Sequence, residues 1–520
     1  MWDYRFGGSD WDNFTCLEVT LDGGFILGGT SLSIDGDKTQ LSFGGGDYWI
    51  VKIDSHGIMQ WDKTFGGTGS DDLTVLKRTS DGGYILGGNS TSGIGGNKTQ
   101  ANWDTTGLKS DYWIVKVDSL GNKQWDADYG GTYLEYLENI QQTSEGGYIL
   151  GGYSYSVISG NKTDSLRGGN GDVDYWIIKT DSIGNIIWDK DFGGANEDYF
   201  YSLEQTFDKG YLLGGYSLSG ISGDKSQATW GNYDFWILKI DSTGTRLWDK
   251  DFGGAGNEKL YSLQQTNDRG FILGGYSTSG INGNKTQDLK GGNGDVDYWI
   301  VKIDSLGNIM WDKDFGGTDW EDAFGNILQT EDQGYLLCGT SYSDIGGDKT
   351  EANLGIEQIW IVKTDTLGNK QWDKTIFTTG HDELGIAMQT RDGCYGIGNF
   401  TQAGIGGYKT QPTWDTSIVN PSADYWIVKF CDTTTTRVSN INTNAIYIIP
   451  NPTTGKFTIT GWNNNNQISK IEIEIFNLTG EKILIFQSQI QADISNLPSG
   501  IYFLKLIAGD KTWHTKIIKE

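Results

Sequence analysis

Residues 297–315 read D-Y-W-I-V-K-I-D-S-L-G-N-I-M-W-D-K-D-F, and versions of this stretch return along the chain roughly every 60 residues. A fixed period of this size is typical of a solenoid or a propeller. Two tryptophans mark each repeat. The first stands at Trp49, Trp113, Trp176, Trp236, Trp299, Trp360 and Trp426. The second stands at Trp2, Trp61, Trp125, Trp188, Trp248, Trp311 and Trp372.

Each repeat is predicted to form four strands joined by tight turns. Around the stretch quoted above we predict strands over 261–266, 271–277, 297–304 and 308–315. The turns between first and second strand and between third and fourth are rich in aspartate and glycine, which suits hairpin loops that need a positive φ. The third strand is apolar on both faces, so we expect the sheets to stack face to face.

The two ends of the repeat region are cut at complementary points. The chain opens on a lone fourth strand, 2–6, and the repeats stop after a third strand, 424–430. In a closed ring the first strand completes the last sheet and removes both exposed edges, whereas an open solenoid gains nothing from this offset. The sequence therefore predicts an all-β fold, with a seven-bladed β-propeller of four-stranded blades over 1–432 whose N-terminal strand closes the last blade.

The composition limits the classes of partner. A formal net charge of −27 argues against nucleic acid. No apolar run approaches the ~20 residues that a membrane-spanning helix needs, so no transmembrane segment is predicted. The four cysteines show no metal-ligand spacing and favour buried thiols, with a disulfide between Cys394 and Cys431 as the alternative.

A polar linker, 433–444, follows the repeats, and a different β pattern occupies 445–520. Its motifs are P-N-P at 450–452, I-E-I-E-I-F-N-L-T-G at 471–480, D-I-S-N-L-P-S-G-I-Y-F-L-K-L at 493–506 and K-I-I-K at 516–519. In this order they closely resemble the type A C-terminal sorting domain of cargo proteins of the type IX secretion system of Bacteroidota.

This resemblance implies a small Ig-like β-sandwich that acts as an address. It implies the outer-membrane translocon and its surface-attachment machinery as partners, and a secreted or cell-surface location. The positions that match the family motifs are Pro450, Asn451, Pro452, Gly455, Gly480, Leu497, Pro498, Gly500, Tyr502 and Lys516. Such cargo also has an N-terminal signal peptide. This sequence begins Met1-Trp2-Asp3 within a predicted strand, so we expect that it lacks its native start or is a fragment.

Function is expected on the face that carries the loops between second and third strands. These loops are long and differ between repeats, and variable insertions on one face of a repeat protein mark its working face. Trp103, Trp230 and Trp414 stand in these loops outside the repeated series. They predict a glycan or protein ligand, with packing over the blade edge as the alternative.

An acid recurs six positions after the aromatic residue of each F-G-G-type segment, at Asp12, Asp71, Glu135, Asp198, Glu258, Glu321 and Glu383. We predict that these acids form a ring near the mouth of the central channel. A lysine recurs in the long loops, at Lys38, Lys98, Lys162, Lys225, Lys285, Lys349 and Lys409. One interpretation is a site for a cation or polar ligand. The other, which sevenfold repetition favours, pairs each carboxylate with a lysine or loop amides at the joint between blades.

The sequence predicts no cofactor, no metal ligand set and no catalytic residue. Oxygen-rich segments such as 35–37 and 344–348 lack the spacing of a calcium loop, which leaves Ca²⁺ open rather than predicted. His56, His381 and His514 show no partner pattern. We expect an exported binding or adhesion protein. The alternatives are a polysaccharide lyase or hydrolase that uses carboxylates, and a structural component of a surface layer.

Overall fold

The computed structural model describes residues 1–169, 171–292, 294–415, 421–432, 447–449, 453–460, 471–477, 481–487, 491–508 and 511–519. The chain divides into two compact units, Met1–Cys431 and Asp432–Glu520. The predicted linker, 433–444, lies outside the described residues. Throughout the described ranges the regular elements are β-strands. These ranges contain no helix of the length and hydropathy needed to cross a membrane.

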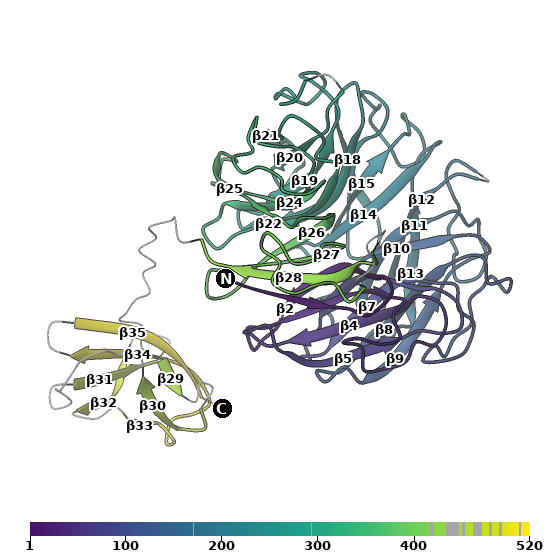
Figure 1. The fold of residues 1–520 in the computed structure, drawn as a ribbon. Coiled ribbons are helices and arrows are strands. Elements are labelled where there is room, and N and C mark those ends of the chain that lie inside the picture. Colours follow the sequence, from purple (N-terminus) through teal and green to yellow (C-terminus); the bar gives the residue numbers. More distant parts are fainter. Residues whose placement is uncertain are drawn as a thin grey trace. The chain divides into compact units, whose positions relative to one another are not determined.

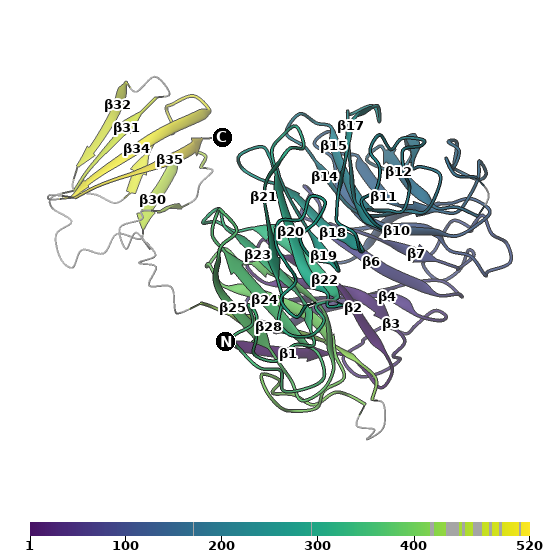
Figure 2. The ribbon, with the colours of Figure 1, turned by 90° about the horizontal axis from the view of Figure 1, so that it is seen from above.

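The first unit is a ring of seven four-stranded antiparallel sheets, which we call blades 1 to 7 (Figures 1 and 2). Blade 1 contains β2 (Asp12–Val19), β3 (Phe25–Ser31), β4 (Asp47–Ile53) and β5 (Met59–Phe65). Blade 2 contains β6 (Asp71–Arg78), β7 (Tyr84–Ser90), β8 (Asp111–Val117) and β9 (Lys123–Tyr129). Blade 3 contains β10 (Glu135–Gln142), β11 (Tyr148–Ser154), β12 (Asp174–Thr180) and β13 (Ile186–Phe192).

The remaining blades repeat the same order. Blade 4 contains β14 (Asp198–Gln205), β15 (Tyr211–Ser217), β16 (Asp234–Ile240) and β17 (Arg246–Phe252). Blade 5 contains β18 (Glu258–Gln265), β19 (Phe271–Ser277), β20 (Asp297–Ile303) and β21 (Ile309–Phe315). Blade 6 contains β22 (Ala323–Gln329), β23 (Tyr335–Ser341), β24 (Gln358–Thr364) and β25 (Lys370–Ile376). Blade 7 contains β26 (Asp382–Gln389), β27 (Tyr395–Thr401), β28 (Asp424–Phe430) and β1 (Trp2–Phe6).

The apolar third strands explain why the blades stack. β4 and β20 are buried along their whole length, as predicted for strands that are covered on both faces. One hydrophobic cluster joins Ile50 of blade 1 to Leu76 and Trp113 of blade 2, and similar clusters recur around the ring. The core of the ring therefore lies between the blades.

The first tryptophan of each repeat holds its blade together. The indole of Trp299 is fully buried, and its Nε1 donates a hydrogen bond to Asp312 at 3.1 Å. The phenol of Tyr48 then donates to the backbone oxygen of Trp113 in the next blade at 2.9 Å. The repeated aromatic residues therefore belong to the scaffold.

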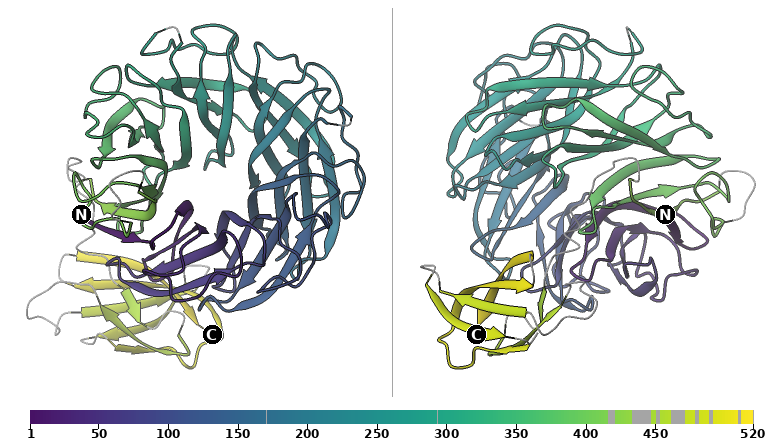
Figure 3. Two further views of the ribbon diagram at one scale, coloured as in Figure 1. Left: turned by 45° about the vertical axis from the view of Figure 1, so that its right-hand side comes forward. Right: turned by 90° about the vertical axis from the view of Figure 1, so that its left-hand side faces the viewer.

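The N-terminal strand closes the ring, as the sequence predicts. β1 pairs with β28 in antiparallel register from Trp2↔Lys429 to Phe6↔Tyr425. The sheet order is β1-β28-β27-β26, so the first strand of the chain is the outer strand of the last blade (Figures 1 and 3). The seven-bladed, all-β architecture is confirmed.

A disulfide joins Cys394 to Cys431, which corrects the expectation of free thiols at these positions. The reason is the register, because Tyr395 pairs with Phe430 and the two cysteines are the next residues out along the same strand pair. Their Cα atoms are 4.2 Å apart. Cys16 and Cys338 are buried free thiols, as predicted.

The second unit has two sheets around one core. One sheet contains β29 (Tyr447–Ile449), β30 (Lys456–Thr460) and β33 (Gln491–Asp493). The other contains β32 (Lys482–Gln487), β31 (Ile471–Phe476), β34 (Gly500–Ala508) and β35 (Lys511–Lys519). Phe457 of the first sheet packs in one cluster with Ile473 and Leu504 of the second. This two-layer arrangement fits a sandwich, and the Ig-like assignment stays a prediction.

Several residues of the sorting motif have structural roles. Gly455 has φ 145°, and a Cβ there would lie 2.2 Å from Oγ of Ser495. The phenol of Tyr502 donates to the backbone oxygen of Pro498 at 2.7 Å. Leu497 packs against the core, Gly500 begins β34, and Lys516 pairs with Phe503. Pro450, Asn451, Pro452 and Gly480 lie outside the described residues.

Candidate functional site

The innermost strands of the seven blades enclose a central channel with a cavity of about 950 Å³. Its wall is formed by β2, β6, β10, β14, β18, β22 and β26. Every blade therefore contributes to this one cavity, and differences between repeats are brought together there.

Each innermost strand contains a β-bulge, and the bulged residue lines the cavity. The register with the second strand shifts in all seven blades. The unpaired residues that line the cavity are Thr15, Thr74, Glu138, Tyr201, Tyr261, Gly325 and Leu384. A bulge changes the direction of one side chain, so that it no longer follows the alternation between the two faces of the strand. The four-stranded blade is thus repeated seven times, whereas the residues on the channel surface differ from blade to blade.

Tyrosines gather in blades 3 to 5, and two of them, Tyr201 and Tyr261, line the channel. We call the following nine residues the tyrosine cluster, all in blades 3 to 5: Tyr136, Tyr153, Tyr155, Tyr199, Tyr201, Tyr216, Tyr233, Tyr261 and Tyr276. Tyr201 contacts Tyr261 edge-on with ring centroids 4.8 Å apart, and Tyr201 stacks on Tyr216 at 5.3 Å. All except Tyr216 are partly exposed. Eight of the nine side chains therefore keep part of their surface accessible to solvent.

Charged groups border the tyrosine cluster. Nζ of Lys259 lies 4.9 Å from the ring centre of Tyr216, and the phenol of Tyr233 donates to Glu197. Glu138 lines the channel and makes no hydrogen bond within the described part of the chain. Burial raises the pKa of Glu138 to about 8. This carboxyl is therefore largely protonated at neutral pH and can donate a hydrogen bond.

The repeated acids lie at the joints between blades rather than on the channel wall. In blade 2, Asp71 is fully buried and accepts hydrogen bonds from the backbone N–H of Gly67 at 2.7 Å and from Ser92 at 2.8 Å. The same amide contact recurs at Asp12, Glu135, Asp198, Glu258 and Glu321. None of these six is among the residues that line the cavity. Their contacts fit the interpretation in which loop amides hold the carboxylates.

In blade 7 the acid at this position is Asp382, and the choice of Glu383 was wrong. Asp382 accepts from the backbone N–H of Thr378 and pairs with Thr401, at the position where Asp71 pairs with Ser90 in blade 2. β25 ends at Ile376, not at Phe377, so counting from the aromatic residue places the acid one position too late. Glu383 instead pairs with Phe400 and is only partly buried.

A second acid begins the third strand of six blades and faces the first acid of the next blade. These residues are Asp47, Asp111, Asp174, Asp234, Asp297 and Asp424, each with a buried Oδ1 that has no hydrogen bond in the described structure. Burial, together with the neighbouring Asp198, raises the pKa of Asp174 to about 7. In blade 6 Gln358 replaces this acid, and its Nε2 donates to Asp382 at 3.1 Å. The amide of Gln358 donates a hydrogen bond where the other blades have a carboxyl facing a carboxyl. This indicates that the two carboxyls of such a pair share a proton.

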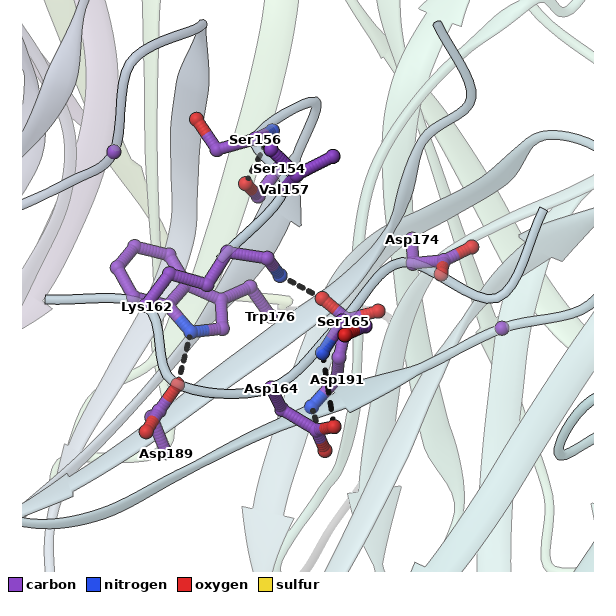
Figure 4. Close-up of polar contacts among 12 residues, drawn as sticks. Ser154, Ser156, Val157, Lys162, Asp164, Ser165, Asp174, Trp176, Asp189 and Asp191 are labelled. Carbon is purple, nitrogen blue, oxygen red and sulfur yellow. Dashed lines mark hydrogen bonds and ion pairs between the residues drawn. The ribbon is translucent and has the colours of Figure 1, made fainter. Parts of the chain in front are cut away.

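The repeated lysines are buried in the same joints. Figure 4 shows blade 3, where Lys162 pairs with Asp191 while Trp176 donates to Asp189 at 3.1 Å. Equivalent ion pairs join Lys98 to Asp128, Lys225 to Asp251 and Lys285 to Asp314. Where threonine replaces this acid, the lysine donates to a serine, as Lys349 does to Ser341 at 2.9 Å. These contacts are structural, because both partners are inaccessible to a ligand.

The acid pairs predict that the stability of the ring depends on pH. Because the pKa of a buried acid is raised, the folded state keeps a proton that the unfolded chain releases. The contribution of this proton to the free energy of unfolding is full below about pH 4 and is lost as the pH rises to about 7 or 8. A Gln358→Glu variant adds a seventh pair. We expect it to match the parent at pH 4.5 and to lose about 1–3 kcal/mol at pH 8, measured by denaturant unfolding.

The reverse change provides the control. Asp174→Asn removes one pair, so its stability relative to the parent is expected to rise between pH 4.5 and pH 8. A difference that does not vary with pH in either variant would contradict proton sharing.

Two of the three loop tryptophans contact the neighbouring blade. Trp103, Trp230 and Trp414 each donate a backbone N–H to the aspartate that begins the following strand. Nε1 of Trp103 donates to Asn161 at 2.6 Å, and Nε1 of Trp414 donates to Asp37 at 2.9 Å. The side chains are 48%, 56% and 43% exposed, respectively. These contacts fit packing over the next blade, and ligand binding by these indoles stays a prediction.

The oxygen-rich segments 35–37 and 344–348 also make contacts within the ring. Asp35 accepts from the backbone N–H of Ser9 at 2.8 Å, and Asp348 lies 3.5 Å from Nζ of Lys290. Ca²⁺ binding at these segments stays open.

Residues 446–520 match the family of secretion system C-terminal sorting domains. The match covers the second unit and the motifs described for it. The chain therefore carries a sorting domain that marks it for export by the type IX secretion system, to the cell surface or the medium.

The remaining comparisons concern the ring. Curated proteins give no match. The Pan2 WD40 domain of Neurospora crassa is similar at 9% identity and TM-score 0.42, over 82% of this chain and 100% of that one. A protein of unknown function from Dyadobacter fermentans is similar at 11% identity and TM-score 0.40, over 82% and 97%. The NanB sialidase of Streptococcus pneumoniae is similar at 10% and 0.37, over 82% and 70%. Similarities this distant transfer no activity.

Proposed function

We propose that this protein is an exported binding protein whose carbohydrate ligand occupies the channel mouth beside the tyrosine cluster. The proposal rests on one observation: nine tyrosines are confined to blades 3 to 5 of a ring that otherwise repeats. Partly exposed aromatic rings can stack on the apolar faces of sugars, and phenol groups supply hydrogen bonds at the same surface. Lys259, Glu197 and Glu138 add charged or polar partners around it.

The distribution of contacts supports this location. The repeated acids and lysines are buried and hold the joints between blades. The residues that differ between repeats include the bulge positions on the channel wall. A ligand that recognises one part of a symmetric ring must use such differing residues, and the tyrosine cluster is their largest aromatic group.

Substitution in the tyrosine cluster is expected to weaken binding. The full chain would first be screened on an array of bacterial, algal and plant glycans, and affinity for the best glycan then measured by calorimetry. Tyr199→Ala and Tyr261→Ala are each expected to lower the affinity at least tenfold, because each removes an aromatic contact worth about 1.4 kcal/mol or more. Tyr133→Ala is the matched control, since Tyr133 is 53% exposed in the same blade as Tyr136 but outside the cluster.

Two results would contradict the proposal. One is an array without any bound glycan. The other is a glycan whose affinity falls in Trp103→Ala, Trp230→Ala or Trp414→Ala but not in the tyrosine variants, which would place the site on the loops. Melting curves of each variant separate loss of binding from loss of folding.

Polysaccharide cleavage is the second candidate, because the pKa of Glu138 suits a general acid at neutral pH. If the protein is a hydrolase or lyase, Glu138→Gln should abolish release of sugar from the bound glycan while leaving its affinity within a few fold. Turnover that Glu138→Gln leaves unchanged would exclude this role for Glu138.

A further inference from the structure

The joint between blades 6 and 7 contains a cluster that no other joint repeats. Glu357 precedes β24, and His381 and Glu383 lie just before and within the start of β26. One potential ligand atom from each of the three residues lies within 4.8 Å of the others. Elsewhere in the ring the position of His381 is held by Trp11, Ser70, Leu134, Glu197, Asn257 and Trp320. The position of Glu357 is held by Gly46, Ser110, Val173, Tyr233, Val296 and Ala423.

One nitrogen atom of this cluster lacks a hydrogen bond within the described structure although it is buried. Glu357 is only 2% exposed, and its Oε1 pairs closely with Nε2 of His381. Nδ1 of His381 is also buried and has no hydrogen-bond partner among the described residues. A buried ring nitrogen without a hydrogen bond is unfavourable, unless a further group binds it.

The backbone around the cluster is fixed by hydrogen bonds. The N–H of Asp382 donates to the oxygen of Glu357 at 3.3 Å, and the N–H of Gln402 donates to the oxygen of His381 at 3.1 Å. The N–H of Leu384, next to Glu383, donates to Oγ1 of Thr340 at 3.2 Å. The phenol of Tyr342 lies against Glu357 and can orient this carboxylate. The three side chains are thus anchored on two adjacent blades.

We propose that Glu357, His381 and Glu383 bind one divalent transition-metal ion of the zinc class. One imidazole nitrogen and two carboxylates are a ligand set that such ions accept, whereas calcium prefers oxygen ligands alone. Three protein ligands also leave a coordination position open. The proposal is independent of ligand binding at the tyrosine cluster, because none of the three residues belongs to it.

Calorimetric titration of ZnCl₂ into the full chain, freed of metal with EDTA, tests the proposal. We expect one equivalent of Zn²⁺ with a dissociation constant in the micromolar range or below. Glu357→Gln, His381→Asn and Glu383→Gln are each expected to weaken binding at least tenfold. His56→Asn is the matched control and should leave the affinity unchanged, because His56 lies in an exposed turn of blade 1.

A spectroscopic measurement on the parent chain tests the proposal even if a variant fails to fold. CoCl₂ bound to the parent chain should give visible absorption bands of a site with mixed nitrogen and oxygen ligands, which ZnCl₂ displaces. In crystals soaked with ZnCl₂, an anomalous peak should lie between the three side chains. Failure of the parent to bind Zn²⁺, binding that folded variants leave unchanged, or an anomalous peak elsewhere would overturn the proposal.

Discussion

Removal of residues 1–6 from the full chain is expected to destabilise the ring by about 5 kcal/mol or more, or to prevent its folding. The deletion exposes the edge of β28 and takes Phe6 out of the core that blade 7 shares with blade 1. It also removes Asp3, which accepts hydrogen bonds from the indole of Trp426 at 3.1 Å and from the backbone N–H and hydroxyl of Thr410 at 2.9 and 2.7 Å. A buried indole N–H would then lack its acceptor. Thermal melting of the truncated and parent chains measures the loss.

A circular permutant tests whether the loss of stability comes from removing β1 or from moving the N-terminus. In this variant the chain begins at Gly7, and residues 1–6 follow Cys431 through a copy of the turn at 304–308. Because β28 and β1 then become a hairpin like β20 and β21, we expect its melting temperature to lie within a few degrees of the parent. A truncated chain that melts like the parent would show that β1 does not hold the ring closed.

Trp299→Ala is expected to destabilise the ring by about 3–5 kcal/mol. The side chain is fully buried between blades 4 and 5, where it packs on Phe235 with ring centroids 4.9 Å apart. Truncation leaves a cavity there and removes the donor to Asp312. Denaturant unfolding measures the change in the free energy of unfolding.

Two further variants show which part of the tryptophan matters. Trp299→Phe keeps most of the volume but not the N–H, so we expect a smaller loss of about 1–3 kcal/mol. Trp230→Ala, at the 56% exposed loop position, is expected to change stability by no more than about 0.5 kcal/mol. Equal unfolding midpoints for Trp299→Ala and Trp230→Ala would contradict the division into scaffold and loop tryptophans.

The scaffold could be predicted from the sequence because a strand that is ambiguous in one repeat can be recognised from the other six. Seven copies of the same two tryptophans and turns define four strands, and the offset between residues 2–6 and 424–430 defines the closure. The joints were predictable in outline for the same reason. The acid in blade 7 was misplaced where this blade departs from the repeat, since its segment reads I-F-T-T instead of F-G-G.

The candidate site could not be predicted in the same way. Which residue faces the channel depends on a bulge in each innermost strand, and a bulge cannot be read from an alternating pattern. Tyr201 and Tyr261 meet because they stand on adjacent blades, 60 residues apart in the sequence. The tyrosines that precede serine at the ends of β11, β15 and β19 were the available signal, because the other blades have different residues there. Likewise, His381 acquires Glu357 as a neighbour only when two blades stack.

The pairing of β1 with β28 has a consequence for the order of events in the cell. During synthesis, β1 must wait for a partner strand that follows it by more than 400 residues. Contacts of such long sequence separation form slowly, because a very large loop must be closed before they can stabilise the fold. The last blade therefore cannot be completed until β28 has also been made. Until then β1 has no partner strand, and unpaired strand edges make an incomplete chain prone to aggregation.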